Sequence, residues 1–201
     1  KFRLKNNTTN EKYIRSISLD SQGNWQMREP DFKSENKLKP IYRLHEIKKE
    51  INPIYIFEGE QKCDIANKLG FISTTSGGSS TVDSHDWRSL NYHQVVLWRD
   101  NDKAGLNWLK DMLKMLDQLT GIDVIIIDIE KLNLAEKGDI VDYVNSHYAD
   151  GEDDITIIER IKNLPILSDE QIQDLLAELA PTILSQNADE KIIIPYSNGF
   201  I

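Results

Sequence analysis

Short apolar runs alternate with helical patterns along the middle of the chain, and this alternation allows few folds. Four runs have the length and composition of strands: 54–57 (IYIF), 71–75 (FISTT), 95–98 (VVLW) and 123–128 (DVIIID). Helical periodicity separates them, most clearly at 103–119, where Trp108 and Met112 recur on one face. Repeated strand–helix–strand units predict an α/β fold, a parallel sheet of about four strands flanked by helices. The unbroken apolar centre of 123–128 predicts a strand covered on both faces.

The segment before this pattern is different in kind. Residues 1–10 are polar, and we expect them to be disordered. A glycine-containing turn at 21–23 separates two alternating runs, which predicts a β-hairpin. Trp25 and Met27 alternate as expected for a half-buried strand of this hairpin.

The chain after residue 138 is acidic and follows helical patterns. Ser168 and Gln171 have the spacing of a capping box. Pro181 is expected to kink or end the helix that they begin. We therefore expect three parts: an N-terminal β-hairpin and basic loop at 1–50, an α/β domain at 51–149 and an acidic helical extension at 150–201.

The net charge of −9 is unevenly distributed along the chain. Residues 1–50 carry 12 Lys and Arg against 7 Asp and Glu, whereas 51–201 carry 12 against 26. Tight binding of nucleic acid needs a basic face, and only the N-terminal part has the charge for one. The alternative is a solvated loop whose lysines keep it soluble.

Cysteine content and hydropathy narrow the class of protein further. Cys63 is the only cysteine, which excludes an internal disulfide and a zinc site made of several cysteines. We expect it to be a small buried apolar side chain. No run approaches 18 apolar residues and no secretory signal opens the sequence, so we expect a cytoplasmic protein with no membrane partner.

Two short acidic motifs follow the first and third strand runs. IYIF is followed by Glu58 and Gly59, and VVLW is followed by Asp100, Asp102 and Gly105. Ligands of such folds bind outside the carboxyl ends of the strands, so these carboxylates are expected to share one edge. Two carboxylates 4 Å apart repel by roughly 4 kcal/mol at an effective dielectric near 20, so a cluster needs a cation. Mg²⁺ or Mn²⁺ meets this need, which predicts metal-assisted phosphoryl chemistry, with the glycines where the backbone passes close to ligand.

With these motifs in this order, the chain resembles the Toprim domain, which is shared by bacterial-type primases, type IA and type II topoisomerases, OLD-type nucleases and RecR-like repair proteins. The resemblance covers about residues 50–145. The stretches IYRLHEI, EGEQKCDIANKLGF, TTSGGS, VVLWRDND and KGDIVDYV are similar to primases, often fused to helicases, of phages, plasmids and other mobile elements. The fold that this resemblance implies is a Toprim-like Rossmannoid sheet.

The resemblance implies a role for each acidic residue that matches. Glu58 matches the motif glutamate, a general base in nucleotide polymerisation or a general acid in strand cleavage. Asp100 and Asp102 match the magnesium-binding pair. Asp64 and Asp139 match further acidic positions that lie near the metals in primases.

The implied activity is that of a DNA primase, a nucleotidyltransferase of DNA replication. It would use NTPs and a single-stranded DNA template to make an RNA primer, beside a helicase domain or partner. Activity of the isolated chain is expected to be weak, because only about fifty residues precede the first strand and no zinc-binding module is present. Two alternatives stay open: a Toprim-type nuclease that hydrolyses phosphodiester bonds, and a non-catalytic module that recruits a helicase through its acidic C-terminal helices.

Several other residues are candidates for phosphate or nucleic-acid contact. Lys103 begins the long helix, and Gly59, Gly77 and Gly78 lie in loops that can approach a nucleotide. Ordinary turns are the alternative for the glycines. His85 is expected to be a solvated loop histidine rather than a phosphate ligand.

The remaining features have structural interpretations. Arg99 is expected to point to the opposite side of its strand from Asp100 and to pair with a neighbouring acid. Trp98 and Trp108 are expected in the core. The run GEDD at 151–154 is expected to be a solvated linker.

Overall fold

The computed structural model describes residues 2–6, 8–9, 11–30, 32, 37–47 and 53–184. Of residues 2–5, 12, 14–15, 79 and 178–184 it describes the backbone alone. The chain divides into two compact units, Lys1–Lys39 and Pro40–Ile201, with the short strand β5 (Lys39–Pro40) at the boundary. Among the described residues, no helix is long and apolar enough to cross a membrane.

The N-terminal unit consists of two antiparallel strand pairs. Strand β1 (Phe2–Lys5) pairs with β2 (Lys12–Arg15), so the expectation of disorder is wrong for Phe2–Lys5. Strand β3 (Ser18–Leu19) pairs with β4 (Trp25–Gln26), which confirms the hairpin. The prediction that this strand is half-buried is wrong, because Trp25 and Met27 are 74% and 67% exposed. Two-stranded pairs have no second layer that would cover such side chains.

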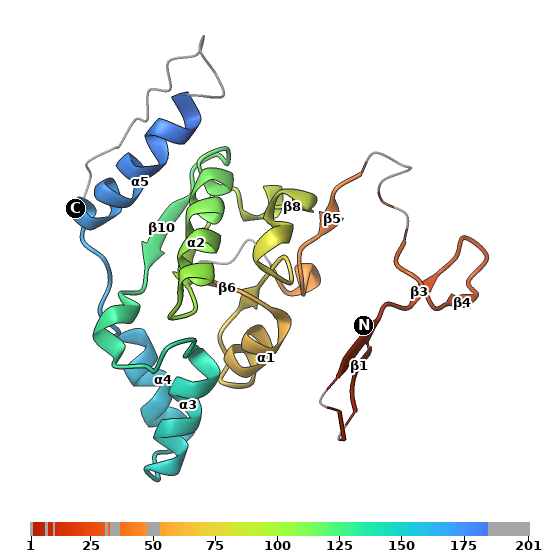
Figure 1. Cartoon of the computed structure of the whole chain (residues 1–201), viewed down its shortest axis with the longest axis horizontal. Helices are drawn as coiled ribbons and strands as arrows, with labels where there is room; N and C mark the ends of the chain where they lie inside the picture. Colours follow the sequence, from red (N-terminus) through yellow and green to blue (C-terminus); the bar gives the residue numbers. More distant parts are fainter. Residues whose placement is uncertain are drawn as a thin grey trace. The chain divides into compact units, whose positions relative to one another are not determined.

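The second unit, which contains β6 and β10 in Figure 1, is built on a parallel four-stranded sheet. The strand order is β10-β9-β6-β7. Its strands are β6 (Ile54–Phe57), β7 (Ser73–Thr74), β9 (Gln94–Trp98) and β10 (Asp123–Ile126). The predicted α/β class and the four strand positions are confirmed. Strand β10 is an edge strand whose first residue, Asp123, is exposed. Val124 and Ile126 pack on one buried cluster and Ile125 and Ile127 on the other, so the expectation that the strand is covered on both faces is confirmed.

Five α-helices follow the strands in the described part of the second unit. They are α1 (Glu60–Lys68), α2 (Lys103–Leu116), α3 (Ile140–Ala149), α4 (Asp154–Lys162) and α5 (Asp169–Leu184). Shorter elements connect them: η1 (Leu44–Glu46), η2 (Ser79–Ser84), β8 (His85–Asp86), η3 (Arg88–Leu90) and η4 (Ile129–Leu132). The Ser168 and Gln171 capping box before α5 is confirmed by reciprocal hydrogen bonds of 2.9 and 3.3 Å. Helix α5 continues past Pro181 to Leu184, so the proline does not end it.

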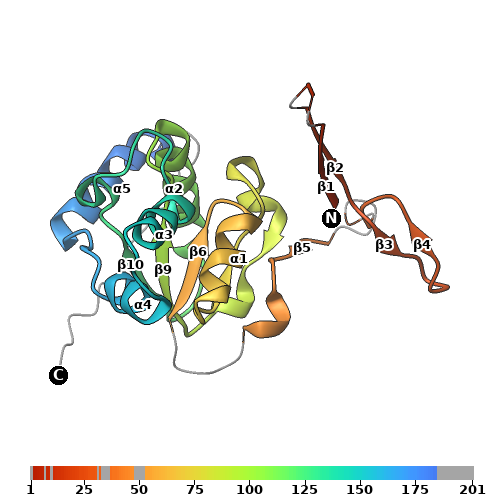
Figure 2. The same ribbon diagram turned by 90° about the horizontal axis from the view of Figure 1, so that it is seen from below.

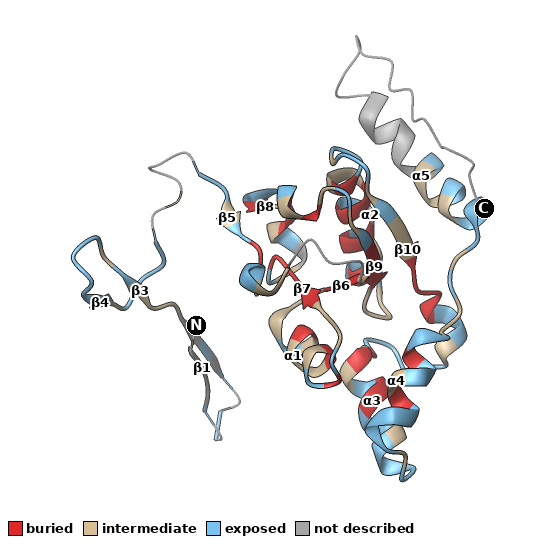
Figure 3. Cartoon of the chain, turned by 180° about the vertical axis from the view of Figure 1, so that it is seen from behind, coloured by how far each residue is buried: buried red, intermediate tan, exposed pale blue. Residues whose placement is uncertain are grey.

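The two faces of the sheet are covered by different helices, because successive residues of a strand point to opposite faces. One face forms a buried cluster with the apolar side of α2: Ile54, Ile56, Val95, Leu97, Trp108, Leu109, Met112 and Leu116. The other face forms a second cluster with α1, α3 and α4: Tyr55, Phe57, Val96, Trp98, Cys63, Ala66, Tyr143, Val144, Ile157 and Ile161. Figure 2 shows α2 and α1 on opposite sides of β6 and β9, and Figure 3 shows the burial of these strands. The sheet is therefore covered by helices on both faces, and its carboxyl edge lies between the two helical layers.

Candidate active site

The two acidic motifs follow neighbouring strands at the same edge of the sheet. Strands β6 and β9 pair in parallel, with Phe57 opposite Trp98, and both residues are buried. Glu58 and Asp100 come one and two residues after this last pair, and both are partly buried. The parallel register explains why acidic residues 42 positions apart in the sequence share one edge of the fold.

Asp100 and Asp139 share one positive charge, which is the ammonium group of Lys62. Lys62 lies in the first turn of α1, and its Nζ donates hydrogen bonds to both carboxylate oxygens of Asp100. The same Nζ lies 3.5 Å from Oδ2 of Asp139, which precedes α3. The side chains of Lys62, Asp100 and Asp139 are only 13%, 18% and 18% exposed. Helices α1 and α3 thus bring a cation and a second carboxylate to the end of β9.

The electrostatics of this cluster act most strongly on Asp100. Burial raises the pKa of Asp100 above its ordinary value, and the nearby charges of Asp139 and Asp102 raise this pKa further. The ammonium of Lys62 acts in the opposite direction and lowers the pKa of Asp100. Three carboxylates therefore lie within electrostatic range of one another, and Lys62 offsets part of their repulsion.

Asp102 has a structural task at the start of α2. Its Oδ1 accepts a hydrogen bond of 2.7 Å from the backbone N–H of Gly105, so Asp102 is the N-cap of the helix. Gly105 is buried, and a Cβ atom added to it would lie 2.4 Å from the carbonyl oxygen of Asp100. We expected glycine at position 105 to let the backbone pass close to a ligand. In the structure, Gly105 instead lets α2 pass close to the backbone of Asp100.

Asn101, between the two aspartates, fixes the loop that carries Asp139. Its backbone N–H donates to the carbonyl of Gly138 at 2.9 Å, and its carbonyl accepts from the N–H of Lys137 at 2.9 Å. Its side-chain amide donates to the carbonyls of residues 134 and 135 at 2.9 and 3.1 Å. These contacts place the KGD loop (residues 137–139) beside the end of β9, which explains how Asp139 reaches Lys62.

Asp139 also caps its own helix. One oxygen accepts hydrogen bonds from the backbone N–H groups of Val141 and Asp142, and the side chain of Asp142 accepts from the backbone N–H of Asp139. The oxygen used for capping is Oδ1, while Oδ2 faces Lys62. A single carboxylate thus holds the helix with one oxygen and the shared cation with the other.

Thr75 connects the turn at Glu58 and Gly59 to the loop that contains Gly77 and Gly78. The hydroxyl oxygen of Thr75 accepts hydrogen bonds from the backbone N–H of Gly59 at 3.1 Å and of Gly77 at 3.0 Å. Gly59 and Gly77 have φ of 108° and 101°, a region that favours glycine, whereas Gly78 is extended. The candidate phosphate loops at Gly59 and Gly77 therefore lie side by side, tied together through buried Thr75.

Asp64 is held by a different set of partners. Its Oδ1 accepts a hydrogen bond of 3.0 Å from the hydroxyl of Tyr42 and lies 3.4 Å from Arg43. Burial and this hydrogen bond raise the pKa of Tyr42. Lys103 is exposed at the first position of α2. The structure thus brings Asp100, Asp102 and Asp139 together, and gives Asp64 a separate ion pair.

The arrangement fits a divalent cation bound by two carboxylates. The described residues contain no group of three or more His, Cys, Asp or Glu side chains arranged to hold a metal ion. Magnesium at nucleotide sites, however, commonly uses one or two carboxylates together with water and substrate phosphates. Asp100 and Asp139 already converge on one cation position, and Mg²⁺ or Mn²⁺ suits such oxygen ligands.

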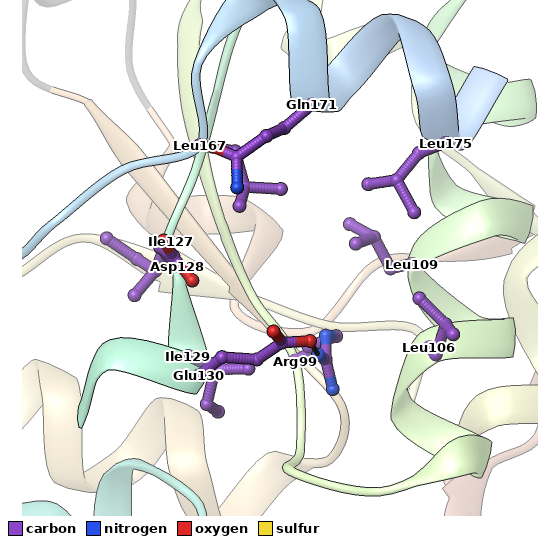
Figure 4. Close-up of a pocket in the computed structure, with 10 residues that line it drawn as sticks. All are labelled: Arg99, Leu106, Leu109, Ile127, Asp128, Ile129, Glu130, Leu167, Gln171 and Leu175. Atoms are coloured by element: carbon purple, nitrogen blue, oxygen red, sulfur yellow. Dashed lines mark ion pairs between the residues drawn. The ribbon is translucent and has the colours of Figure 1, made fainter. Parts of the chain in front are cut away.

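A pocket of about 280 Å³ lies on the α2 face of the sheet, beneath α5 (Figure 4). Its wall is mainly apolar, and Arg99 lies at one end of it. The guanidinium of Arg99 donates to the carbonyl of Asp100 at 2.9 Å and lies 3.5 Å from Glu130, which confirms its expected pairing with an acid. Asp128 is 2.8 Å from Lys131. The charged groups of this pocket are thus paired with charges of the chain itself.

Other residue predictions have mixed outcomes. Trp98 and Trp108 are in the core, and Cys63 is buried, which raises the pKa of its thiol to about 12. His85 is buried beside the carbonyl of Thr81, so the solvated histidine is wrong. The run 151–154 is more than a solvated linker. Asp153 caps α4 by accepting a hydrogen bond of 2.8 Å from the backbone N–H of Thr156. Glu152 lies 2.7 Å from Arg160 and 3.2 Å from His147.

Comparison with protein-family models, with curated proteins and with solved structures found no match. The resemblance to the Toprim domain therefore stays a prediction. The sequence reasoning missed Lys62, Asn101 and Thr75. A signal for Lys62 was present, because clustered carboxylates need a counter-charge and Lys62 follows Glu58 by only four residues.

Proposed function

We propose that the second unit is the catalytic domain of a primase-type nucleotidyltransferase with a Toprim-like fold. One observation carries the proposal: Asp100 and Asp139 converge on a single cation position at the edge where the strand of Glu58 also ends. A parallel sheet with carboxylates at its carboxyl edge supports metal-assisted chemistry on a phosphate substrate. The polymerisation activity rests on the resemblance of the two acidic motifs.

Each residue then has a role in the transfer. Asp100 and Asp139 hold Mg²⁺ or Mn²⁺, which when bound supplies positive charge for the phosphate oxygens. Glu58 takes the proton of the attacking 3′-hydroxyl. The 3′-oxygen forms a bond to the α-phosphorus of an NTP, and the bond from that phosphorus to pyrophosphate breaks. Lys103 and the amino end of α2 attract the triphosphate.

The test is template-dependent RNA synthesis by the whole chain. It is incubated with single-stranded DNA, labelled NTPs and Mg²⁺ or Mn²⁺, beside Asp100→Asn and a matched control, Asp123→Asn. Asp123 is exposed at the amino end of β10, so its substitution removes the same charge at the opposite edge. Labelled RNA from the wild type and the control, with a loss on the order of 100-fold in Asp100→Asn, supports the proposal.

The other outcomes favour the alternatives. Shortened DNA without labelled RNA would favour the nuclease. If all three folded proteins are inactive on DNA, while a helicase binds the wild type and Asp100→Asn equally, the domain is a non-catalytic module. Either result would contradict the primase proposal.

A further inference from the structure

The ammonium group of Lys62 lies between the carboxylates of Asp100 and Asp139. It reaches both oxygens of Asp100 and lies 3.5 Å from Oδ2 of Asp139. At 13% exposure the side chain is too enclosed to be an incidental surface lysine. We propose that Lys62 is a built-in counterion of the site, which neutralises the Asp100–Asp139 pair without metal and which a divalent cation must displace.

The proposal starts from charge balance. Two partly buried carboxylates that face one position repel each other, and Asp102 adds a third negative charge nearby. A metal-free site of this kind needs a cation for the two helices to close on it. Lys62 supplies that cation from α1, so the edge of the sheet is assembled before any ion binds.

Competition follows from the same geometry. An ammonium and a divalent cation cannot share one position, and their like charges repel. The four-carbon stem of a lysine is flexible, so its ammonium can swing out while α1 stays in place. Because this inference rests on the proposed metal site, Lys62 is a positioning residue that sets metal affinity. Its removal should therefore strengthen metal binding, whereas removal of a metal ligand would weaken it.

The experiment is a calorimetric titration of the whole chain with Mn²⁺, using the wild type, Lys62→Met and Lys68→Met. Lys68 lies at the exposed end of the same helix, six residues or about 9 Å along its axis, so it is a matched control for charge. We expect Lys62→Met to bind Mn²⁺ tighter, on the order of tenfold, with a lower unfolding temperature in the absence of metal. Lys68→Met should match the wild type in both.

A second measurement needs no variant and covers the case in which Lys62→Met does not fold. The ¹⁵Nζ resonance of Lys62 in the wild type is followed during a Mg²⁺ titration, and we expect it to shift towards that of solvated lysines. Equal or weaker Mn²⁺ binding by folded Lys62→Met, or an unchanged resonance at saturating Mg²⁺, would overturn this inference and leave the proposed function intact. Absence of Mn²⁺ binding in all three proteins would instead contradict the proposed metal site itself.

Discussion

Substitution of Gly105 by alanine tests the geometry that places Asp100. The added Cβ would lie 2.4, 2.8 and 3.0 Å from the backbone O, N and C of Asp100. These atoms belong to the main chain at the end of β9, so they cannot move away as a flexible side chain can. Either α2 or the residue that carries the carboxylate must shift.

Two opposing effects decide the sign of the change in stability. Alanine is a better helix former than glycine by about 1 kcal/mol. Overpacking of a buried position costs about 1–3 kcal/mol of stability. Because the added Cβ would lie only 2.4 Å from the carbonyl oxygen of Asp100, we expect a cost near the upper end of this range. We therefore expect a net destabilisation of about 1–2 kcal/mol and a melting temperature lower by about 2–8 °C for a chain of this size.

The assay is urea and thermal unfolding followed by tryptophan fluorescence, because Trp98 and Trp108 are buried on either side of the sheet. Gly78→Ala is the matched control, since Gly78 is extended and its added Cβ would meet no atom within 4 Å. It should change stability by less than about 1 kcal/mol. If Gly105→Ala is as stable as the wild type or more stable, helix propensity outweighs the steric clash and the reasoning is refuted.

Three further predictions concern the charged cluster. The pKa of Asp100, measured by NMR, should exceed the ordinary value of 3.8. The contribution of protonated Asp100 to the free energy of unfolding is therefore fully present below pH 3.8 and is lost as the pH rises through the raised pKa. Lys62→Met should raise the pKa of Asp100 further, because the ammonium of Lys62 lowers it. Asn101→Ala should lower the free energy of unfolding by about 1–2 kcal/mol in urea, because two hydrogen bonds to residues 134–135 are lost. Asp139→Ala should cost about 1 kcal/mol as a lost N-cap and Asp139→Asn less, while calorimetry should show Mn²⁺ binding weakened in both.

Each of these has a contrary result. A pKa of Asp100 below 3.8 would mean that Lys62 outweighs burial. Wild-type stability in Asn101→Ala would show that the backbone bonds alone hold the KGD loop. Normal Mn²⁺ binding in Asp139→Asn would leave Asp139 with a capping role and no part in the metal site.

The sequence predicted the sheet well, because 54–57, 95–98 and the centre of 123–128 are continuous apolar runs, which are typical of a buried parallel strand. The rule for strand ends predicted that Glu58, Asp100 and Asp102 share one edge, and the family resemblance added Asp139 and also Asp64, which has separate partners. The sequence did not reveal that Asp102 caps α2 or that Gly105 is required by the backbone of Asp100. The spacing of Asp102 and Gly105 fits a ligand loop and a helix start equally well, and only the hydrogen bond and the close contact in the structure separate the two.

The N-terminal unit shows what the sequence pattern could not predict. The alternation around Trp25 predicted a strand correctly but not its exposure, since periodicity says which side chains share a face and not what covers that face. Strand β1 was missed because its sequence, FRLK, is as charged as a loop. Long-range contacts such as that of Lys62 with Asp139 depend on the packing of α1 on α3, which local patterns do not encode.

Anomalous diffraction from crystals of the chain grown with Mn²⁺ tests the metal site most directly. We predict one strong anomalous peak in contact with the carboxylates of Asp100 and Asp139, with the ammonium of Lys62 displaced from between them. A saturating Mn²⁺ concentration that gives no peak at this position, with Lys62 still bound to both aspartates, would contradict the proposed centre.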